Sequence, residues 1–587
     1  MAGHLAKTVY RVLADYSLRR FLIHAANPLR WPKLAAMRRV REAETMAFSR
    51  ALEPWQGMAN ATARERHFVF RRWMASAPGT AAAVRGASFV PTDAGADPEL
   101  RMRVDRLGGV LEAAAADPAA AWMTVAGWFE TRPRAADFHR DSYSISERLA
   151  NLILLWNLCE PPETLATPLA AMMQEEADRL LGHPEYHGEN GTNNHILNNA
   201  RALILAGTFF DSSRFFEAGR WMFENQFGRH VLPDGVLREG SSHYQWVIAR
   251  WIVDVACAFR YRDADAYRRL VPALGRMLDV CDAVATATGE CWHLPLVGDI
   301  SPDFPPNFYR GLSAFGRRVA QDDASTGNGA GSDGLWDRHF SGTVPNARGD
   351  WIAADGSWAR LARGPWSLLT HADVSPGENR PTHGHHDLFS FDLAFNCRPV
   401  IVDPGRGNYM AARDEEAAGI LEEWHNTVIV GGARTGFVPR GYMPPDWLAS
   451  FRPQPRVSLT SEGLAVSVDA MPGARGGQAR RMFVLGASGN LRVVTQLSMK
   501  DGRALPVRLV LYLAGKARVE DGCARLDAGG SEIVLRWSGL GRPVSRPALR
   551  YVGYDTGEPC TRLEWDVVAE GPQWESVIDI APTEAAP

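Results

Sequence analysis

Apolar residues recur at the spacing of an α-helix across the middle of the chain, from residue 140 to residue 290. The segment SISERLANLILLWNL, residues 144–158, begins with Ser144 and Glu147 at the spacing of a capping box, which marks the start of a helix. Its large apolar side chains fall on one helical face: Ile145, Leu149, Leu152, Ile153 and Trp156. The pattern predicts an amphipathic helix over this segment.

Further helices follow on short connections. The helical spacing returns in HILNNARALILAGTFF (195–210), SRFFEAGRWMFENQF (213–227), HYQWVIARWIVDVACAF (243–259) and AYRRLVPALGRMLDVCDAVATA (266–287). Breaks such as LPDG at 232–235 separate them. Because helices on short connections pack as antiparallel neighbours, this part of the chain predicts a bundle, a solenoid or a ring of helical hairpins.

The periodicity changes after QDDASTGNGAGSDG at 321–334, a segment rich in Gly, Ser and Asp that is typical of a linker. In LFSFDLAFN (388–396), large apolar residues alternate with polar or small ones, as in a β-strand. Short runs rich in β-branched residues follow between turn residues: RPVIVD, HNTVIV, LAVSVDA, LRVVTQLSM, VRLVLYLAG and SEIVLRW. This half predicts an antiparallel β-sandwich.

The expected architecture is therefore multidomain, α and then β. We expect a helical domain over residues 1–340, an incomplete (α/α) toroid, and an antiparallel β-sandwich domain over 345–587. A length of 587 residues suits two such modules, because single cores seldom grow so large.

Charge and composition exclude several partners. The chain carries 64 basic and 67 acidic residues, so no bulk charge favours nucleic acid or a membrane surface. Seven cysteines lie scattered without a C-x-x-C pair, which argues against a thiolate zinc site. No segment has the length and apolar character of a transmembrane helix. The amino-terminal segment is basic but lacks the continuous apolar run of a secretory signal, so we expect a cytoplasmic protein, or a periplasmic or secreted one if its leader is atypical or removed.

Two polar clusters stand at predicted helix starts. In GTNNHILNNA, Asn193, Asn194 and His195 open an apolar helix, where asparagine is also a common cap. In LREGSSHYQW, Glu239, His243 and Tyr244 lie between a turn and a helix. Each cluster by itself is compatible with a capped helix start, so the residues alone leave both a structural and a catalytic interpretation open.

A third cluster, HGHHD at 383–387, is more specific because three imidazoles within four residues are typical of metal or catalytic sites. Side chains alternate in an extended segment, so His383 and His385 should point to one side and His386 to the other. His385 forms a set of two histidines and one carboxylate with Asp403 and His425, and this set suits zinc. A satisfied network of hydrogen bonds is the alternative.

The order of these motifs resembles the heparinase II/III-like polysaccharide lyases, a family that includes alginate lyases. The resemblance is carried by YSISERLANLILLW, NNHILNNARALILAGTFF, LPDGVLREGSSHY, HGHHDLFSFDLAFNCRPVIVDPGRGNY and WHNTVIV, and covers roughly residues 140–430. It implies a toroid followed by a sandwich, with a site between them that cleaves a uronic-acid-containing acidic polysaccharide or oligosaccharide by β-elimination.

The resemblance also implies roles for individual residues. Asn194 is similar to the asparagine that binds the uronate carboxylate, and His195 to the histidine beside it. Tyr244 resembles the tyrosine that acts as acid and often as base, and His383 resembles a second catalytic histidine. His385, Asp403 and His425 resemble the ligands of a structural zinc ion. The expected substrate contacts are Asn193, Glu239, His243 and Arg380. Gln245 departs from the histidine that many relatives carry directly after the tyrosine.

If Tyr244 is to act as the base, its pKa must lie below the usual value near 10, and His243, Arg238 and Arg250 are the candidate donors. Three other functions fit the sequence. A glycoside hydrolase on the same fold needs two carboxyl groups, for which Glu239 with Asp387 or Glu147 are candidates. A carbohydrate-binding protein of exopolysaccharide assembly would keep the fold without turnover, and a zinc-dependent hydrolase is a further alternative. Assembly into a homo-oligomer is possible.

Overall fold

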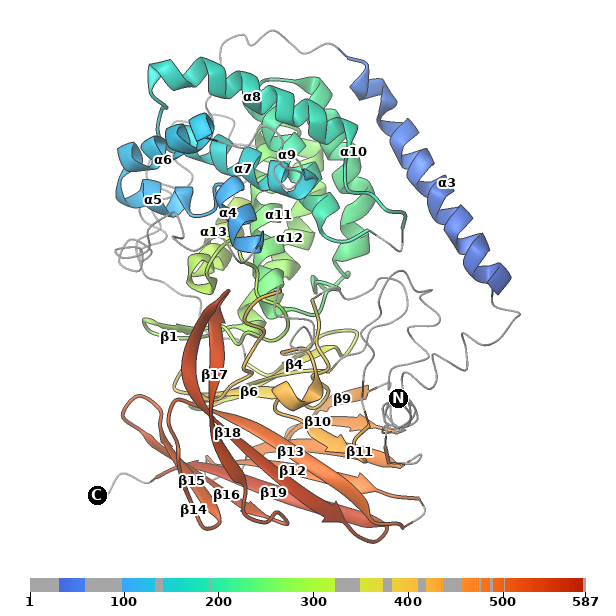
Figure 1. Cartoon of the computed structure of the whole chain (residues 1–587), viewed down its shortest axis with the longest axis vertical. Helices are drawn as coiled ribbons and strands as arrows, with labels where there is room; N and C mark the ends of the chain where they lie inside the picture. Colours follow the sequence, from blue (N-terminus) through green and yellow to red (C-terminus); the bar gives the residue numbers. More distant parts are fainter. Residues whose placement is uncertain are drawn as a thin grey trace, which may run out of the picture.

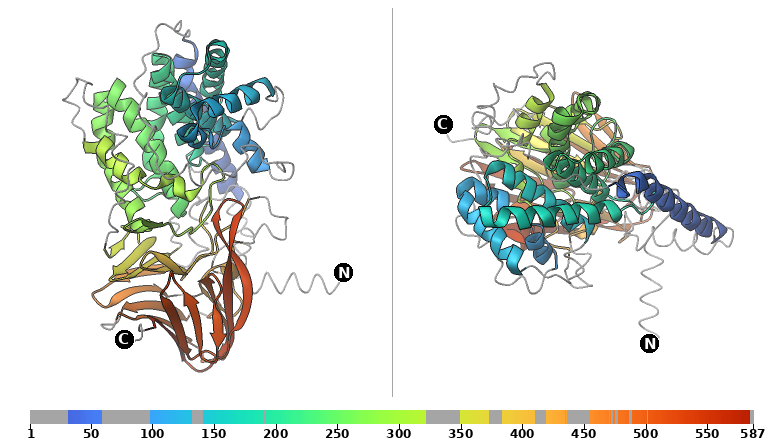
Figure 2. Two further views of the ribbon diagram at one scale, coloured as in Figure 1. Left: turned by 90° about the vertical axis from the view of Figure 1, so that its left-hand side faces the viewer. Right: turned by 90° about the horizontal axis from the view of Figure 1, so that it is seen from above.

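The computed structural model describes residues 31–58, 98–131, 141–189, 192–321, 349–372, 383–409, 419–433, 435, 455–469, 471, 473–474, 477–485, 489–500 and 502–583. Helices form one part of the molecule and β-sheets the other (Figure 1), and the two views of Figure 2 agree on this division. The predicted fold class, a helical toroid followed by an antiparallel β-sandwich, is confirmed. The predicted domain boundary near 345 lies outside the described residues and stays a prediction.

The helical part runs from the first described element to the linker. Its helices are α3 (Trp31–Gln56), α4 (Pro98–Asp105), α5 (Val110–Ala116), α6 (Pro118–Thr131), α7 (Ser142–Leu158), α8 (Glu163–Gly182), α9 (His195–Phe209), α10 (Ser213–His230), α11 (Ser242–Arg262), α12 (Ala264–Val284) and α13 (Leu312–Gln321), with a short 3-10 helix at Pro306–Tyr309. The predicted helices correspond to α7, α9, α10, α11 and α12. None of the described helices is long and apolar enough to cross a membrane.

The helices lie in two layers. Nearly every side chain of α7, α9 and α11 is buried, whereas α8, α10 and α12 bury only one face. This alternation of inner and outer helices is the arrangement of a toroid. The polar residues of the inner helices are paired: the Arg201 guanidinium lies 3.1 Å from Glu147 and 2.7 Å from Asp254, all three buried. Burying such charges without partners would cost free energy of folding.

The predicted capping box at the start of α7 is wrong. The helix begins at Ser142, and its cap is Asp141, whose carboxylate accepts a hydrogen bond from the backbone N–H of Ser144 at 2.8 Å. Glu147 does not reach back to the helix start because its side chain pairs with Arg201 instead.

The sandwich is built from two large sheets, and all of their strand pairs are antiparallel. One sheet has the order β14 (Arg518–Glu520), β15 (Cys523–Asp527), β16 (Glu532–Ser538), β19 (Gln573–Pro582), β12 (Leu491–Ser498), β11 (Gln478–Leu485), β10 (Gly463–Val468) and β9 (Pro455–Leu459). The other has the order β17 (Val544–Gly553), β18 (Thr556–Ala569), β13 (Leu505–Ala514), β7 (Arg398–Ile401), β6 (Phe391–Phe395), β5 (Trp366–His371), β4 (Trp358–Arg363) and β3 (Trp351–Ile352), and β8 (Val428–Val430) pairs with β13. A small sheet of β1 (Thr286–Thr288) and β2 (Cys291–His293) follows α12.

The core of the sandwich lies between the two large sheets. Phe391 of β6 contacts Phe483 of β11 edge to face, with ring centroids 4.9 Å apart. The predicted alternation of β6 places its large apolar residues in this core, but the residues between them are buried as well. Asp392 faces the helical part, where its carboxylate lies 3.1 Å from His293 Nε2. The helical part therefore covers the outer face of this sheet.

A long hairpin, β17 with β18, rises from the sandwich beside the helical part (Figure 1). Near its tip, the Tyr551 N–H donates to the Pro404 carbonyl, and the Asp555 N–H donates to the Gly407 carbonyl, both at 2.8 Å. The fit is close, because a Cβ on Gly407 would lie 2.3 Å from the Tyr551 ring. The hairpin thus holds the segment that follows β7.

Candidate active site

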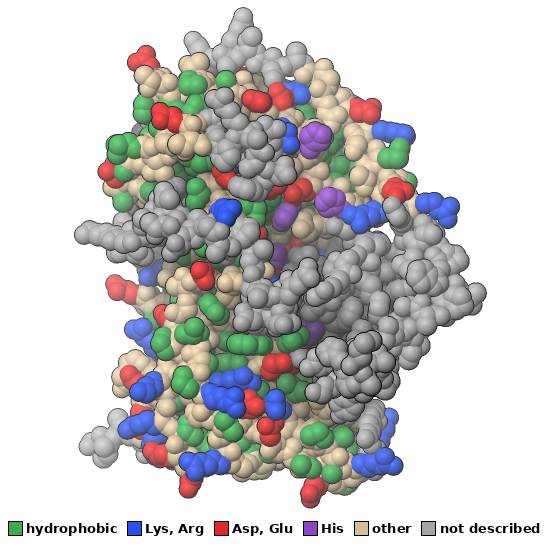
Figure 3. Space-filling model, viewed as in Figure 1, with side chains coloured by type: hydrophobic (Ala, Val, Ile, Leu, Met, Phe, Trp, Pro, Cys, Tyr) green, Lys and Arg blue, Asp and Glu red, His purple; other side chains and the backbone are tan. Residues whose placement is uncertain are grey.

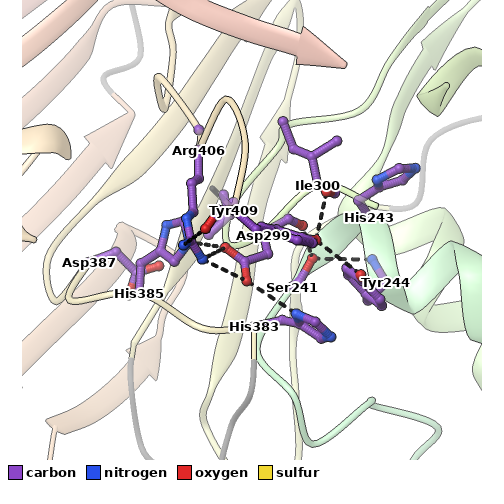
Figure 4. Close-up of polar contacts among 12 residues, drawn as sticks. Ser241, His243, Tyr244, Asp299, Ile300, His383, His385, Asp387, Arg406 and Tyr409 are labelled. Carbon is purple, nitrogen blue, oxygen red and sulfur yellow. Dashed lines mark hydrogen bonds and ion pairs between the residues drawn. The ribbon is translucent and has the colours of Figure 1, made fainter. Parts of the chain in front are cut away.

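Tyr244 lies in the first turn of α11. Ser241 caps this helix, accepting the Tyr244 N–H on its hydroxyl at 3.2 Å and donating its own proton to the Asp299 carbonyl at 2.7 Å. The Tyr244 hydroxyl lies 3.0 Å from the hydroxyl of Tyr409, which donates to the Ile300 carbonyl at 2.7 Å (Figure 4). Since the single proton of Tyr409 goes to Ile300, the proton between the two tyrosines belongs to Tyr244.

Tyr409 was not singled out from the sequence. It follows the turn GRG at the end of the motif that begins with HGHHD, and this position after a glycine-rich turn was the available signal. Its backbone N–H donates to the Tyr554 hydroxyl at 3.1 Å, and the Arg406 guanidinium lies 5.1 Å from the centre of its ring. The tip of the β17–β18 hairpin thus positions the second tyrosine of the site.

His383 comes from the sandwich side of the junction and stacks on Tyr244, with ring centroids 3.6 Å apart and an interplanar angle of 13°. Its Nδ1 lies 3.2 Å from the Asp299 carboxylate, and the Asp299 N–H donates to the His383 carbonyl at 2.8 Å. The backbones meet at Gly298, which has φ +81°, and a Cβ there would lie 2.6 Å from the Gly240 carbonyl oxygen. Glycine is required at this position because no side chain fits.

Asp299 joins the two domains. Its carboxylate accepts from His385 Nε2 at 2.8 Å as well as from His383, and Arg406 lies at 3.3 Å. Burial by itself would raise the pKa of Asp299, but the hydrogen bonds from both histidines and the charge of Arg406 hold it far below its ordinary value. The predicted orientation of HGHHD is therefore confirmed: His383 and His385 contact one carboxylate, whereas His386 lies 3.5 Å from Glu422.

Asn194 caps α9 without a side-chain hydrogen bond to its own helix. Its side-chain amide and its backbone N–H both donate to the carboxylate of Glu239, and its amide nitrogen lies 3.4 Å from His383 Nε2. Asn194 and Glu239 are both buried. The structure therefore brings together Asn194, Glu239, Tyr244 and His383, four of the predicted site residues.

His195 and Asn193 belong to the same helix start. The Asn193 side-chain oxygen accepts the His195 N–H at 3.1 Å, and His195 Nδ1 lies 2.5 Å from a carboxylate oxygen of Glu185, a residue that the sequence gave no reason to select. Burial acts to lower the pKa of His195, but the hydrogen bond and charge of Glu185 outweigh it, so the pKa is raised. Figure 3 shows histidine side chains, in purple, on one face of the molecule, over the helical part and down toward the β part.

His243 and Gln245 lie behind this site. His243 is fully buried, its Nδ1 accepts the Ser301 N–H at 3.0 Å, and burial lowers its pKa to about 3. This placement supports the loop beside Asp299 and does not favour a direct substrate contact. The Gln245 side chain binds the backbone of Leu237 and Gly235, so the departure at this position lies outside the contacts of Tyr244. Arg380 lies outside the described residues.

The lowered pKa that a base role for Tyr244 would require is not found. Burial raises this pKa well above its ordinary value, and the hydrogen bond to Tyr409 offsets only part of the effect. His243 remains uncharged, and the Arg250 guanidinium lies 4.3 Å from the centre of the Phe304 ring. Tyr244 is therefore a protonated phenol at neutral pH.

The three predicted zinc ligands lie close together in the sandwich. The ring centroids of His385 and His425 are 5.2 Å apart, and His425 Nδ1 lies 2.8 Å from the Asp403 carboxylate. Among the described residues, the buried ring nitrogens His385 Nδ1 and His425 Nε2 have no hydrogen-bond partner, which leaves two donors for a metal. Asp403 is turned toward His425 here, and within the described residues no three potential ligands are arranged around one point. Zinc stays a prediction.

The carboxylates proposed for a hydrolase are all engaged elsewhere. Glu147 pairs with Arg201 inside the toroid, Asp387 accepts from His371 Nδ1 at 2.8 Å, and Glu239 holds Asn194. All three are buried. No pair among these residues offers one acid and one base to a sugar placed between them, as hydrolysis requires.

A helical toroid and an antiparallel sandwich thus meet around a tyrosine, a histidine and an asparagine. This class of protein has known representatives. Residues 345–548 match the family model described as Heparinase II/III-like, C-terminal. Among solved structures, heparinase III has 13% sequence identity and a TM-score of 0.60, over 94% of this chain and 92% of that chain. The heparan sulfate lyase HepC from Pedobacter heparinus has 13% identity and a TM-score of 0.54, over 93% and 89%.

No curated protein matches the sequence. The predicted resemblance to the heparinase II/III-like family is confirmed by the other two comparisons. Residues 345–548 match the model of that family's C-terminal domain, and the chain shares the fold of heparinase III.

Proposed function

We propose that this protein is a polysaccharide lyase that cleaves a uronic-acid-containing acidic polysaccharide or oligosaccharide by β-elimination. The observation that carries the proposal is the stack of Tyr244 on His383, which brings an acid from the toroid against a base from the sandwich. The similar solved structures carry the names of a heparinase and a heparan sulfate lyase, which supports an acidic polysaccharide as the substrate class.

β-Elimination makes three demands on a site. A base removes the proton from C5 of the uronic acid, the electron pair forms the C4–C5 double bond, and the bond from C4 to O4 breaks. An acid then supplies a proton to O4. Because C5–H is only weakly acidic, negative charge that moves onto the carboxylate must be stabilised as it develops.

His383 is suited to the base role. The Asp299 carboxylate accepts at Nδ1, so the neutral ring carries its proton there, and Nε2 keeps a lone pair. Nε2 faces the Asn194 amide nitrogen at 3.4 Å, and the His383 side chain keeps 14% of its surface exposed. This lone pair therefore faces the side-chain amide of the residue that the family resemblance assigns to the uronate.

Tyr244 is suited to the acid role. Its proton is held toward Tyr409, and its raised pKa keeps it protonated until a strongly basic alkoxide develops at O4. The same raised pKa disfavours Tyr244 as the base. The proposal therefore separates the two roles: His383 accepts the C5 proton, and Tyr244 donates to the leaving group.

The uronate carboxylate would bind at the amino terminus of α9, where Asn194 and His195 lie and where the helix dipole favours an anion. Glu239 orients the Asn194 amide in this structure.

Zinc, which we propose on His385, Asp403 and His425, would supply structural cross-linking of the sandwich segments that position His383. A cytoplasmic location stays a prediction.

Ultraviolet absorbance during incubation with a panel of uronate polymers, including heparan sulfate and alginate, tests the proposal. The wild type should produce the unsaturated sugar that only elimination forms, and Tyr244→Phe should lower the rate by about 10²–10⁴-fold. Tyr267→Phe is a matched control, because it removes a phenol hydroxyl that donates to Val319 inside the toroid, and it should retain activity.

Each alternative gives a different result in this assay. New reducing ends without the absorbance would favour a hydrolase and contradict the proposal. Binding of a polymer without cleavage would favour a carbohydrate-binding protein. Equal rates for Tyr244→Phe and the wild type would exclude Tyr244 as the acid.

A further inference from the structure

Glu185 and His195 form a close pair at the start of α9. The carboxylate oxygen Oε2 lies 2.5 Å from His195 Nδ1. The backbone of each partner is also fixed by a hydrogen bond. The Glu185 N–H donates to the side-chain oxygen of Asn199 at 2.7 Å, and the His195 N–H donates to the side-chain oxygen of Asn193 at 3.1 Å. The Tyr143 ring packs against the imidazole, with centroids 4.4 Å apart. Contacts on three sides therefore fix the orientation of His195.

We propose that Glu185 is a positioning residue that holds His195 as an imidazolium, and that this cation binds the uronate carboxylate of the substrate. The inference rests on the proposed lyase function and deepens it. It assigns to His195 the charge neutralisation that the family resemblance gives to Asn194, and it requires a substrate with a carboxylate at the cleaved residue.

The contacts of Asn194 and His195 explain this assignment. The Asn194 amide already donates to Glu239, and the negative charge of that carboxylate would repel a second one. His195 Nε2 has no hydrogen-bond partner in the described part of the chain, and a third of the His195 side chain, 34%, is exposed. Of these two side chains, His195 is therefore the one with a ring N–H that has no partner within the described residues.

The surroundings of His195 are mixed in charge, but Glu185 is the nearest group. The charged and titratable groups around it come from the turn after α4, from α7, from the segment before α9, from the end of α10 and from the segment before α11: Arg106, Tyr143, Glu185, His187, His230 and Glu239. Arg106 disfavours a second cation, but its guanidinium is itself paired with Asp303 at 3.0 Å. The pKa of Glu185 is lowered by His195, as expected for an ion pair.

An imidazolium has no lone pair, so this state excludes His195 as the base. It leaves His383 as the histidine with a free ring nitrogen in the site, in agreement with the roles proposed above. It also provides a full positive charge for the carboxylate, which a neutral amide does not.

Nitrogen NMR of the imidazole groups tests the charge state without any substrate. Protein labelled with ¹⁵N at its histidines should show both ring nitrogens of His195 protonated at pH 7, with His195→Gln identifying the signal. In Glu185→Gln, which keeps the shape and removes the charge, the pKa of His195 should fall by about 1–3 units. Glu189→Gln is the matched control, because this carboxylate of the same segment pairs with Arg229 at 2.6 Å, and it should leave the His195 signal unchanged.

Kinetics with heparan sulfate, or with the first polymer of the panel that the wild type cleaves, test the function of the pair. Because the cation is the active form, activity is lost as pH rises through the pKa of His195. Glu185→Gln should shift this alkaline limb of kcat/KM to a pH that is lower by about 1–3 units. Glu185→Asp, which keeps the negative charge, should show a smaller shift. A merely structural role of Glu185 would lower activity equally at every pH.

The outcomes separate the two proposals. A neutral His195 at pH 7 in the wild type, or identical pH limbs for the wild type and Glu185→Gln, would overturn the inference. An imidazolium that Glu185→Gln neutralises, in a protein that cleaves no polymer of the panel, would support the ion pair and count against the lyase function.

Discussion

Replacing Asp299 by asparagine is the most informative perturbation of the junction. The carboxylate accepts hydrogen bonds from His383 and His385 and pairs with Arg406. The two histidines come from the segment before β6, and Arg406 comes from the segment after β7. Asparagine keeps the shape of the side chain but removes its charge and one acceptor. The variant therefore tests whether this one carboxylate both orients the base and holds the sandwich against the toroid.

The structure sets the expected magnitudes. Arg406 and His383 each keep 14% of their side-chain surface exposed, and Asp299 keeps 6%. Breaking such a largely buried pair from one side costs about 3–5 kcal/mol, because the remaining charges lose their partner. Loss of the group that fixes the tautomer of His383 should lower kcat by about 10²–10⁴-fold, the range for removal of a positioned acid or base. KM should change less, since Asp299 faces the histidines and Arg406.

The assay combines ultraviolet detection of the unsaturated product with denaturant unfolding of the same preparation. Asp392→Asn is the control, because Asp392 also pairs with a histidine across the two domains, His293 at 3.1 Å, without touching Tyr244 or His383. It should lose stability and keep its activity per folded molecule. If Asp299→Asn retained kcat within threefold of the wild type, the assignment of His383 as an oriented base would be refuted.

Two further predictions concern the surroundings of the site. The purified protein should contain about one zinc ion per chain, and His425→Ala should lose it and unfold at lower denaturant concentration; metal analysis without zinc in the wild type would contradict this. Gly407→Ala should lower kcat by about tenfold to a hundredfold, because its Cβ would lie 2.3 Å from the Tyr551 ring and displace Tyr409. Gly228→Ala, with no atom within 4 Å of the new Cβ, should not lower it.

The order of helices and strands was predictable because it follows from local periodicity. What the periodicity missed was the burial of the inner helices on all sides. The pattern of α7 predicts one apolar face, yet Ser144, Glu147 and Arg148 on the other side are buried too. Their burial depends on partners far along the chain, such as Glu176, whose carboxylate lies 2.6 Å from Arg148. A local pattern cannot show such pairing.

The site was predictable in part for a related reason. The groups that we propose to react, Tyr244 and His383, stand in motifs with an unusual local composition. The groups that control them do not: Asp299, Tyr409 and Glu185 lie in irregular segments without periodicity. Asp299 reaches His383 across 84 positions of sequence, and Tyr244 reaches Tyr409 across 165. The roles of Asp299 and Tyr409 become visible only when the two domains are placed together, and that of Glu185 only when its contact with His195 is seen.

The junction of the domains also sets the acid strength of Tyr244. His383 covers one face of its ring, and Tyr409 holds its hydroxyl, so two residues of the sandwich help to remove a toroid side chain from water. Burial is the largest cause of the raised pKa of Tyr244. The sandwich therefore does more than supply the base: by covering Tyr244 it keeps the phenol protonated until the leaving oxygen develops charge. A toroid without its sandwich would retain Tyr244 and Asn194 and lose both the base and the environment that makes the acid, so the two domains together form the catalytic unit.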